Sequence, residues 1–579
     1  MGVAATNLGD RVLASLGNLA EGAPVVFEPC DDLSKGGVLT ALPALLACGL
    51  LRYSAKYFHL PKGYYTLSNI FLLFGFMPLN RVHSIEALRR QPPGEWGKIL
   101  GLDRVPVAET LRVKLKLITR NEKSVQSWAA DLARDWMEDE GAQQSVGGLL
   151  YLVDGHVRVY HGSQTKLPRH YVARQRLCLR ATTDYWVNQS DGAPVFKINQ
   201  AVDPGMVKVL REEIIPRLEA DVPNQPSPAQ QAEDPLLPRL TVVFDREGYS
   251  PELFRHLWKE KRIACQTYRK GAYEPWDDAL FTAREVVLNN GRKVTWELAE
   301  MGTLLGAKKD EPGSGIWVRE IRKKSQRGHQ TAILSTNFKL SAEAVAARQF
   351  GRWSQENFFR YASQSFDLDR LVDYELGMIP DTVEVINPRW REFDGQVRKL
   401  AALGAKRRAE FGGLTLEGEI EPDKVEDFFA RKSVLQTEIE ELDRQLTEVK
   451  AARRGERKKV PLSELSEEER FLPLNQRGKH FIDTIKIVAY RAETVVAQIL
   501  AEKMNAHHRD EARRLARQIF QSEINLRPDL AAKTLTVQIH GMSTPRDDLA
   551  LEHLCEELTA TETIYPGTEL RMVYRKVSN

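Results

Sequence analysis

The sequence predicts an α/β protein in which a mixed sheet lies between helical segments. Three observations carry this prediction. Apolar residues keep helical spacing up to about residue 145, strand-like alternation begins near Gly147, and a charged segment with helical periodicity follows Pro380. The length of 579 residues corresponds to three or four domains at about 150 residues each.

The composition indicates a folded protein of nearly neutral charge. Hydrophobic residues make up 42% of the chain, and 82 Lys and Arg stand against 79 Asp and Glu. A net charge of +3 excludes a protein that coats DNA or an anionic membrane through bulk charge, but it permits local basic surfaces. The five cysteines are scattered without a CxxC pair, which supports neither a zinc ribbon nor a disulfide framework.

The start of the sequence lacks the basic and then apolar layout of a signal peptide. The apolar run Val38–Leu51 is shorter than the ~18–20 residues that a bilayer requires. We therefore expect a soluble cytoplasmic protein with no membrane partner.

Residues 1–145 are predicted to form a helical N-terminal domain that binds DNA. Two short helical patterns flank the turn Gly101–Val105, so residues 95–118 resemble a helix-turn-helix unit, whose second helix can enter a major groove. An ordinary helical hairpin with solvated lysines explains the same pattern. The apolar face of the second helix would carry Leu111, Leu115 and Ile118, and its candidate DNA contacts are Arg112, Lys114 and Lys116.

The mixed sheet is predicted over residues 146–274 and 336–379. The segment GGLLYLVDGHVRVYHG alternates as a strand does, around an Asp-Gly pair that is a hairpin signal. Later segments alternate between strand and helix patterns, as a mixed α/β sheet requires. The strand patterns are Arg176–Val187, TVVF before Asp245 and Ile263–Tyr268, and the helical patterns are Asp203–Ala220 and Pro251–Lys261.

Residues 275–335 return to strand alternation around an Asn-Asn-Gly turn and are predicted to be a β-rich insertion. Ser341 then caps a helix with the sequence SAEAVAARQFGRWSQENFFRYA.

The C-terminal third is predicted to contain a helical, coiled-coil region over 380–520 and a small α/β unit over 521–579. The coiled coil could pair two protomers, or it could fold back on a long helix predicted at Gly478–Asn505. A basic run, Arg453–Lys459, follows the coil. The seam residues at 3-4 spacing are Val425, Phe428, Leu435, Ile439, Leu442, Leu446 and Val449.

Three carboxylates occupy positions from which they could meet. Asp154 is predicted to end the first strand of the sheet, Asp245 to end TVVF, and Glu356 to lie on the helix after TAILSTN. Open α/β sheets build sites at the carboxyl ends of their strands. Hard divalent cations offset the repulsion between close carboxylates, and two Mg²⁺ ions about 3.5–4 Å apart can cleave a phosphodiester.

Each carboxylate also has a simpler explanation. Asp154 could belong to a hairpin turn, and Asp245 could be a turn residue at a strand end. Glu356 could form a salt-bridge ladder with Arg352 and Arg360 on the surface of its helix.

The order of these elements resembles the RNase H-like catalytic core of DDE transposases of the insertion-sequence type, which carry a β-rich insertion before the glutamate. YLVDGHVRVYHG is similar to the first-Asp strand, LTVVFDREGYS to the second-Asp strand and ARQFGRWSQENFFRYA to the glutamate helix. The family has a Tyr-Arg-Glu-Lys signature on that helix. Arg352 and Glu356 match its Arg and Glu, whereas its Tyr falls on Gln349 and its Lys on Ser363. The resemblance covers residues 147–365 well.

The resemblance implies a DNA transposase in which Asp154, Asp245 and Glu356 hold two Mg²⁺ ions, with Mn²⁺ as a substitute. Water would cut the strand at a transposon end, and the freed 3′-OH would attack target DNA. Arg352 and Arg360 would neutralise phosphates of the scissile strand. The implied partners are transposon-end DNA, target DNA and a second copy of the chain, in a bacterial-type protein associated with the nucleoid.

The insertion of this family helps to hold the transposon end, where an aromatic residue can stack on a displaced base. Trp296 and Trp317 are the candidates here, although a buried core tryptophan is the commoner case. Lys323 and Lys324, in a basic run of the insertion, are further candidate DNA contacts.

Two alternatives remain open from the sequence. One is a metal-dependent nuclease of the same fold that does not transfer strands. The other is a non-catalytic DNA-binding protein derived from a transposase. A P-loop ATPase is not supported, because the sequence contains no GxxxxGK[ST] motif.

Overall fold

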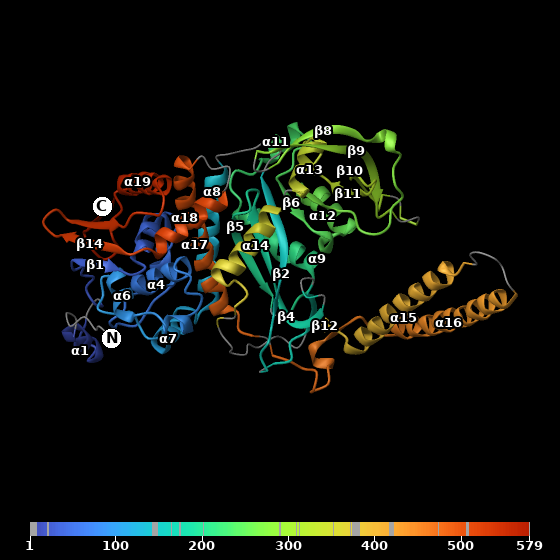
Figure 1. Cartoon of the computed structure of the whole chain (residues 1–579), viewed down its shortest axis with the longest axis horizontal. Coiled ribbons are helices and arrows are strands. Elements are labelled where there is room, and N and C mark those ends of the chain that lie inside the picture. The colour runs from blue at the N-terminus through green and yellow to red at the C-terminus, as the bar shows by residue number, and fades with distance from the viewer. Residues whose placement is uncertain are drawn as a thin grey trace.

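The computed structural model describes residues 8–19, 22–141, 149–163, 165–172, 175, 177–200, 202–288, 291–307, 310–311, 313–350, 353–370, 372, 383–415, 422–472, 474–504 and 509–577. Of residues 353–357 it describes the backbone only. The described chain has three parts (Figure 1): a body that contains both ends of the chain, a large sheet with its covering helices, and a projecting pair of helices.

The N-terminal part is mainly helical, as predicted. Helix α4 is apolar on nearly all sides because it crosses the interior of the body. Thr66 begins it with a capping box: its hydroxyl accepts from the N–H of Asn69 at 3.2 Å, and the Asn69 side chain accepts from the N–H of Thr66 at 3.0 Å. The helices are α1 (Leu8–Ser15), η2 (Gly36–Ala41), α2 (Leu42–Ala47), α3 (Ser54–Tyr57), α4 (Leu67–Leu79), α5 (Ile85–Leu88), α6 (Pro93–Ile99), α7 (Ala108–Ile118) and α8 (Glu122–Gly141).

Both ends of the chain form one hydrophobic core, which the sequence patterns did not indicate. Strand β1 pairs with β14, so the N-terminal part adds an edge strand to the small C-terminal sheet. Helix α17 runs through this core and packs on α2, α4, α18 and α19. The elements are β1 (Cys30–Leu33), α17 (Arg477–Lys503), α18 (Arg509–Gln521), β14 (Ile524–Asp529), β15 (Thr534–Ile539), α19 (Pro545–Ala560) and β16 (Arg571–Lys576).

The large sheet has ten strands in the described residues. Its first half has the order β5-β4-β2-β6-β7, in which β5, β4 and β2 are antiparallel neighbours and β2, β6 and β7 are parallel. Three antiparallel strands followed by two parallel ones form the RNase H-like core that the sequence predicted. The strands are β2 (Leu150–Val159), β3 (Arg169–Val172), β4 (Leu177–Gln189), β5 (Pro194–Gln200), β6 (Leu240–Phe244) and β7 (Ile263–Tyr268).

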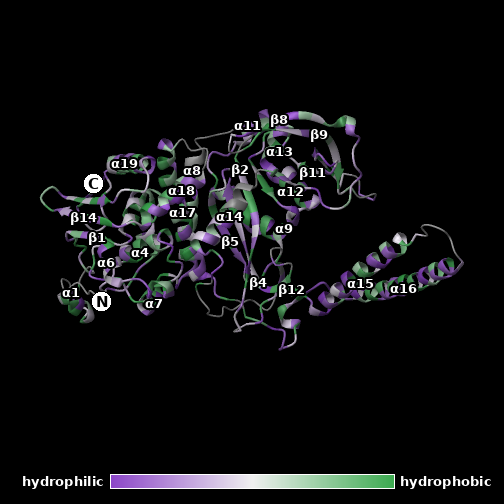
Figure 2. Ribbon diagram, viewed as in Figure 1, coloured by the Kyte–Doolittle hydropathy of each residue, from purple (hydrophilic) through white to green (hydrophobic). Residues whose placement is uncertain are grey.

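Helices cover both faces of this core. One face carries Tyr151, Val153 and Tyr185, which pack against α9, η3, α10 and α12. The other face carries Trp186 and Lys197, which contact α14 and α17. Figure 2 shows the central strands as predominantly hydrophobic, as expected for a sheet buried on both faces. The helices are α9 (Met206–Val209), η3 (Leu210–Ile214), α10 (Ile215–Asp221), α11 (Pro228–Glu233), α12 (Pro251–Lys261), α13 (Ala342–Phe350) and α14 (Trp353–Phe366).

The predicted β-rich insertion continues the same sheet rather than forming a separate one. Strand β11 pairs with β7, and β10, β9 and β8 follow it in antiparallel order. Ser341 begins α13 as predicted, because its hydroxyl accepts from the N–H of Ala344 at 3.1 Å. The strands are β8 (Thr282–Val287), β9 (Lys293–Leu305), β10 (Ile316–Lys324) and β11 (Gln330–Ser335).

Helix α16 (Pro422–Gly455) packs against α15 (Pro388–Gly413), and the two helices project from the body as an antiparallel hairpin (Figure 1). Arg408 pairs with Asp443, and Arg453 pairs with Asp394 at 2.6 Å. The alternative that α16 folds back on the helix predicted at Gly478–Asn505 is wrong. The apolar seam of α16 is covered by α15, and the predicted helix is α17, which lies in the core of the body. The short strands β12 (Glu384–Ile386) and β13 (Lys459–Pro461) close the base of the hairpin.

Among the described residues, no helix combines the length and the apolar character that crossing a membrane requires.

Candidate active site

Asp154 and Asp245 lie side by side on neighbouring parallel strands. The register of β2 on β6 places Leu152 opposite Val243, so two residues further along Asp154 lies beside Asp245. Residues two apart on a strand share a face, and Leu152 and Val243 belong to one small apolar cluster. Both aspartates therefore extend from the same face, and both are half-buried.

Asp154 does not end a strand, and Asp154-Gly155 is not a hairpin turn, so these two predictions are wrong. β2 continues through both residues to Val159 and pairs with β4, Asp154 opposite Trp186 and Gly155 opposite Tyr185. Pairing with β4 along nearly the whole of β2 outweighs the local turn preference of Asp-Gly. Gly155 has a packing role instead, since a Cβ there would lie 3.3 Å from the Tyr185 ring.

Asp245 follows β6 directly, as predicted, and a third carboxylate comes with it. The short turn Arg246–Gly248 begins after Asp245, whose Oδ1 accepts from the N–H of Glu247 at 2.8 Å. Burial, together with the negative charges of Asp245, Asp203 and Asp154, raises the pKa of Glu247 to about 7. The edge of the sheet therefore holds more negative charge than the neighbouring protein groups neutralise.

Asp203 is the fourth carboxylate of this edge, and it lies between β5 and α9. It accepts from the hydroxyl of Tyr185 at 2.7 Å and from the N–H of Gly205 at 2.8 Å. Our sequence interpretation missed both Asp203 and Glu247. The signal that could have found them is local: Asp203-Pro-Gly follows a strand pattern, and Glu247 is two residues past a candidate aspartate.

Helix α14 carries Glu356 across the same edge. On one side of Glu356 in the sequence, Phe350 contacts Tyr268 at the end of β7, with ring centroids 6.1 Å apart. On the other side, Phe359 stacks on His156 of β2, with centroids 5.0 Å apart. Strand β6 lies between β2 and β7, so the segment with Glu356 passes over the strand that leads to Asp245. The side chain of Glu356 lies outside the described residues.

The other positions of the predicted signature have different surroundings. Arg352 lies outside the described residues, and Arg360 is exposed on α14. Gln349 is buried, and its amide donates to the carbonyl oxygen of Phe244 at 3.5 Å, directly before Asp245. The Ser363 hydroxyl is buried with no hydrogen-bond partner in the described part of the chain. Gln349 therefore supports the backbone of the site, although it lacks the phenol of the family's tyrosine.

The predicted DNA contacts of α7 lie around its buried face. Arg112 is exposed and forms an ion pair with Glu86. Lys116 is exposed, whereas Lys114 is half-buried, which lowers the pKa of its ammonium group. These residues are far along the chain from Asp154, and the structure places them on the body rather than on the large sheet.

Among the candidate DNA contacts of the insertion, Lys323 and Trp296 lie near Phe350, the residue that ends α13, the helix before α14. The ammonium group of Lys323 lies 3.8 Å from the ring centre of Trp296 and 4.6 Å from that of Phe350. Trp296 is half-buried in this cluster, whereas Trp317 is 63% exposed. Lys324 is paired with Asp278 at 3.3 Å and with Glu297 at 3.5 Å.

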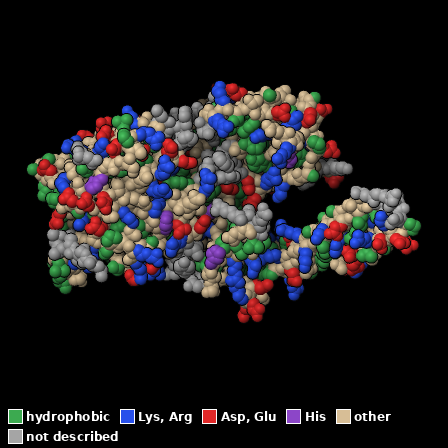
Figure 3. Space-filling model, viewed as in Figure 1, with side chains coloured by type: hydrophobic (Ala, Val, Ile, Leu, Met, Phe, Trp, Pro, Cys, Tyr) green, Lys and Arg blue, Asp and Glu red, His purple; other side chains and the backbone are tan. Residues whose placement is uncertain are grey.

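The base of the hairpin reaches the carboxylate edge. Lys459 donates to the carbonyl oxygen of Pro204 at 3.4 Å, and His170 lies 3.7 Å from the carboxylate of Asp203. Figure 3 shows Lys and Arg side chains gathered where the hairpin joins the rest of the molecule. Lys459, the last residue of the predicted basic run, therefore lies next to the candidate site, which its position in the sequence did not indicate.

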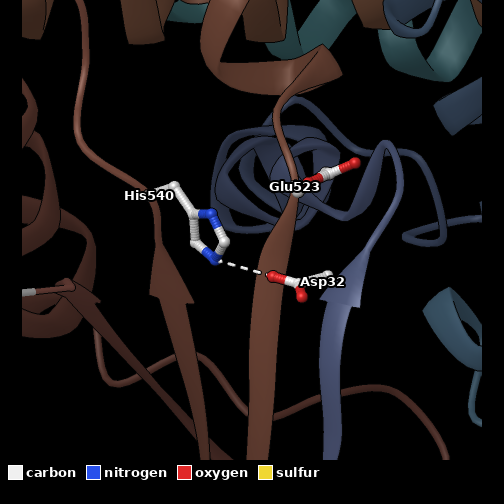
Figure 4. Close-up of side chains that lie close together, drawn as sticks. All are labelled: Asp32, Glu523 and His540. Carbon is white, nitrogen blue, oxygen red and sulfur yellow. Dashed lines mark ion pairs between the residues drawn. The ribbon is translucent and has the colours of Figure 1, made fainter.

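One other group of metal-ligating side chains lies away from this edge. Asp32 lies on β1, Glu523 directly precedes β14 and His540 directly follows β15 (Figure 4), and their ligand atoms lie within 4.8 Å of one another. Asp32 and Glu523 are exposed, and His540 lies 3.5 Å from Asp32. This group belongs to a different sheet from Asp154 and takes no part in the candidate site.

The strand order and the paired aspartates place the chain in the RNase H-like class of α/β proteins. A family model described as "Transposase protein" matches residues 2–578, nearly the whole chain. The chain therefore belongs to this family of transposases, which makes DNA its substrate. No curated protein matches it.

Proposed function

We propose that this protein is a DDE transposase that cuts DNA at transposon ends and joins the freed 3′ end to target DNA. The observation that carries the proposal is the placement of Asp154 beside Asp245, under the helix that carries Glu356. This is the arrangement that two-metal phosphodiester chemistry needs, since the reacting phosphate must lie between ligands of both ions.

The residues present fit divalent Mg²⁺. Carboxylate oxygens are its preferred ligands, and the raised pKa of Glu247 reflects negative charge that a cation would neutralise. Asp154, Asp245 and Glu356 would hold two Mg²⁺ ions, or Mn²⁺ in their place. When bound, the ions supply an activated water or 3′-OH and stabilise the leaving oxygen. Because the attacking group is water or DNA, no Ser, Tyr or Cys nucleophile is required.

The chain's own residues would bind and orient DNA around this edge. Arg352 and Arg360, on either side of Glu356, would neutralise the phosphates of the scissile strand. Lys323 and Trp296 would hold the transposon end beside α14. Lys324, which follows Lys323 on β10, would add positive charge there. Arg112, Lys114 and Lys116 on α7 would contact DNA further along the duplex.

We propose that the active form is a homodimer, because two transposon ends require two sites. Every described residue of α16 is at least partly exposed, and Phe429 and Val434 on it are 63% and 59% exposed. These two exposed apolar side chains are the candidate contacts with a second copy of the chain. Sedimentation of the full chain with and without end DNA tests this, and Phe429→Glu combined with Val434→Glu should yield the monomer.

Cleavage and strand transfer by the full chain test the proposed function. The substrate is labelled DNA from the sequence that flanks the gene, incubated in Mg²⁺ with a supercoiled target plasmid. The wild type should nick the end and insert it into the plasmid, whereas Asp154→Asn and Asp245→Asn should bind the DNA but leave it uncut. Glu252→Gln, an exposed change on α12, is the matched control and should retain full activity.

The products decide between the candidate functions. Insertion into the plasmid supports a transposase, and cutting without insertion supports a nuclease of the same fold. Full cutting by Asp245→Asn would contradict the assigned site. DNA binding without any cutting by the wild type would indicate a non-catalytic derivative. A protein with this activity would work on chromosomal DNA, at the nucleoid of a bacterial cell.

A further inference from the structure

His156 connects the strand of Asp154 with the helix of Glu356. It lies two residues after Asp154 on β2, so both side chains extend from the same face of the sheet. The imidazole is 7% exposed and stacks on Phe359 of α14, with centroids 5.0 Å apart and planes inclined by 8°. Phe359 is three residues, about one helical turn, after Glu356.

The Nε2 atom of the same imidazole contacts the segment that follows α14. His156 Nε2 forms an ion pair with Asp369. Two lysines of α17 bind the same turn: Lys479 Nζ donates to the carbonyl oxygen of Leu368 at 2.7 Å, and Lys486 Nζ donates to that of Asp367 at 2.9 Å. His156 is thus the sheet residue that touches both the middle of α14 and the turn that ends it.

A second contact fixes the rotation of the helix about its axis. Phe358 packs on Trp186, with centroids 5.4 Å apart, and Trp186 lies opposite Asp154 on β4. The two adjacent phenylalanines of α14 therefore rest on β2, the strand of Asp154, and on β4, the strand next to it. A helix held at two neighbouring residues has little freedom to slide along the sheet.

We propose that His156 is a positioning residue: its stack on Phe359 and its ion pair with Asp369 set the distance between Asp154 and the backbone of Glu356. This inference rests on the proposed function, because it gives His156 a role in assembling the metal site. Removal of residues that orient metal ligands typically lowers metal affinity about 10–100-fold. A residue with a packing role alone would lower stability and leave metal affinity unchanged.

The test measures Mn²⁺ binding by the full chain, from the electron paramagnetic resonance signal of the free ion, together with the thermal midpoint without metal. We expect His156→Ala to weaken Mn²⁺ binding about tenfold. His156→Phe keeps a ring on Phe359, and Asp369→Asn alters an exposed partner, so both should fold and weaken binding less than His156→Ala. His256→Ala, at a half-buried histidine of α12 that contacts Glu260, is the control and should bind as the wild type does.

Mn²⁺ affinity within twofold of the wild type in His156→Phe and Asp369→Asn would overturn the inference, whatever happens to His156→Ala. A loss of affinity in these folded variants, with an unchanged thermal midpoint, would support it. Asp154→Asn serves as the reference that removes the site. If the wild type binds Mn²⁺ through Asp154 but cuts no DNA, the proposed function fails while the positioning role of His156 stands.

Discussion

The ammonium group of Lys197 on β5 forms an ion pair with the carboxylate of Asp483 on α17, and both side chains are at most 1% exposed. This contact joins the large sheet to the helix that runs through the body. Asp483 also pairs with Lys479 of its own helix at 2.5 Å. Two buried ammonium groups thus pair with one carboxylate, and Lys197 also lies 3.7 Å from the carboxylate of Asp184.

Asp483→Ala should lower the free energy of unfolding by about 3–5 kcal/mol, because it leaves buried cations without their partner. Burial raises the pKa of Asp483, but the positive charges of Lys197 and Lys479 outweigh burial and hold this pKa below its ordinary value. The stabilisation should therefore be present above the ordinary pKa of a carboxyl and be lost as the pH falls below it. Urea unfolding at neutral pH measures the effect, and Glu467→Ala, an exposed change, should stay within about 0.5 kcal/mol of the wild type.

Glu247→Gln should raise the thermal midpoint at pH 8 and do little at pH 5. The pKa of Glu247 is raised from 4.5 to about 7, so the folded state keeps a proton that the unfolded state loses between these values. Stability of the wild type therefore falls as the pH rises through this range, and a neutral glutamine removes that loss. Thermal melts without divalent cations test this, and an equal gain at both pH values would contradict the assignment. Mg²⁺ should stabilise the variant less than the wild type.

Gly37→Ala should weaken the contact between the N-terminal and the C-terminal part of the body. A Cβ on Gly37 would lie 1.8 Å from the backbone oxygen of Ile519 in α18, so the contact between the helices η2 and α18 must open. Overpacking of this kind costs about 1–3 kcal/mol. Gly395→Ala in α15 is the matched control, since nothing lies within 4 Å of its added Cβ and it should stabilise the helix. Urea midpoints that move equally in both variants would contradict the close approach at Gly37.

Arg454→Ala should weaken DNA binding and lower the slope of log affinity against log salt by about 1, if Arg454 contacts a phosphate. Arg454 is exposed at the base of the hairpin, near the carboxylate edge. Arg444→Ala is the matched control on the same helix, because Arg444 is already paired with Glu441 at 2.6 Å and with Glu448 at 2.7 Å. An unchanged slope for Arg454→Ala, measured by fluorescence anisotropy over a range of salt, would remove the hairpin base from the DNA surface.

The elements of the core could be predicted from the sequence because each has a strong local pattern. TVVF before Asp245 is β6, the alternation at Ile263–Tyr268 is β7, and Ser341 begins α13. The heptad seam of α16 was visible for the same reason. The packing of α15 on this seam was not predicted, because α15 carries only a weak apolar pattern.

The errors fall where tertiary contacts outweigh local preference. Asp154-Gly155 has the sequence of a hairpin turn, but β4 pairs with β2 through both residues and keeps the strand extended. Asp203 and Glu247 carry no motif of their own, and they become part of the site because β5 and β6 end at the same edge. Lys459 reaches that edge from a position more than two hundred residues further along the chain.

By itself the sequence predicted the fold class, the strand that leads to Asp245 and the helix that carries Glu356, because strand alternation and helical spacing are properties of short segments. The tertiary structure alone decided that Asp154 lies beside Asp245, that His156 links this strand to α14 and that the two ends of the chain share one core. Those relationships depend on register and on contacts between distant segments, for which a single sequence holds no local signal.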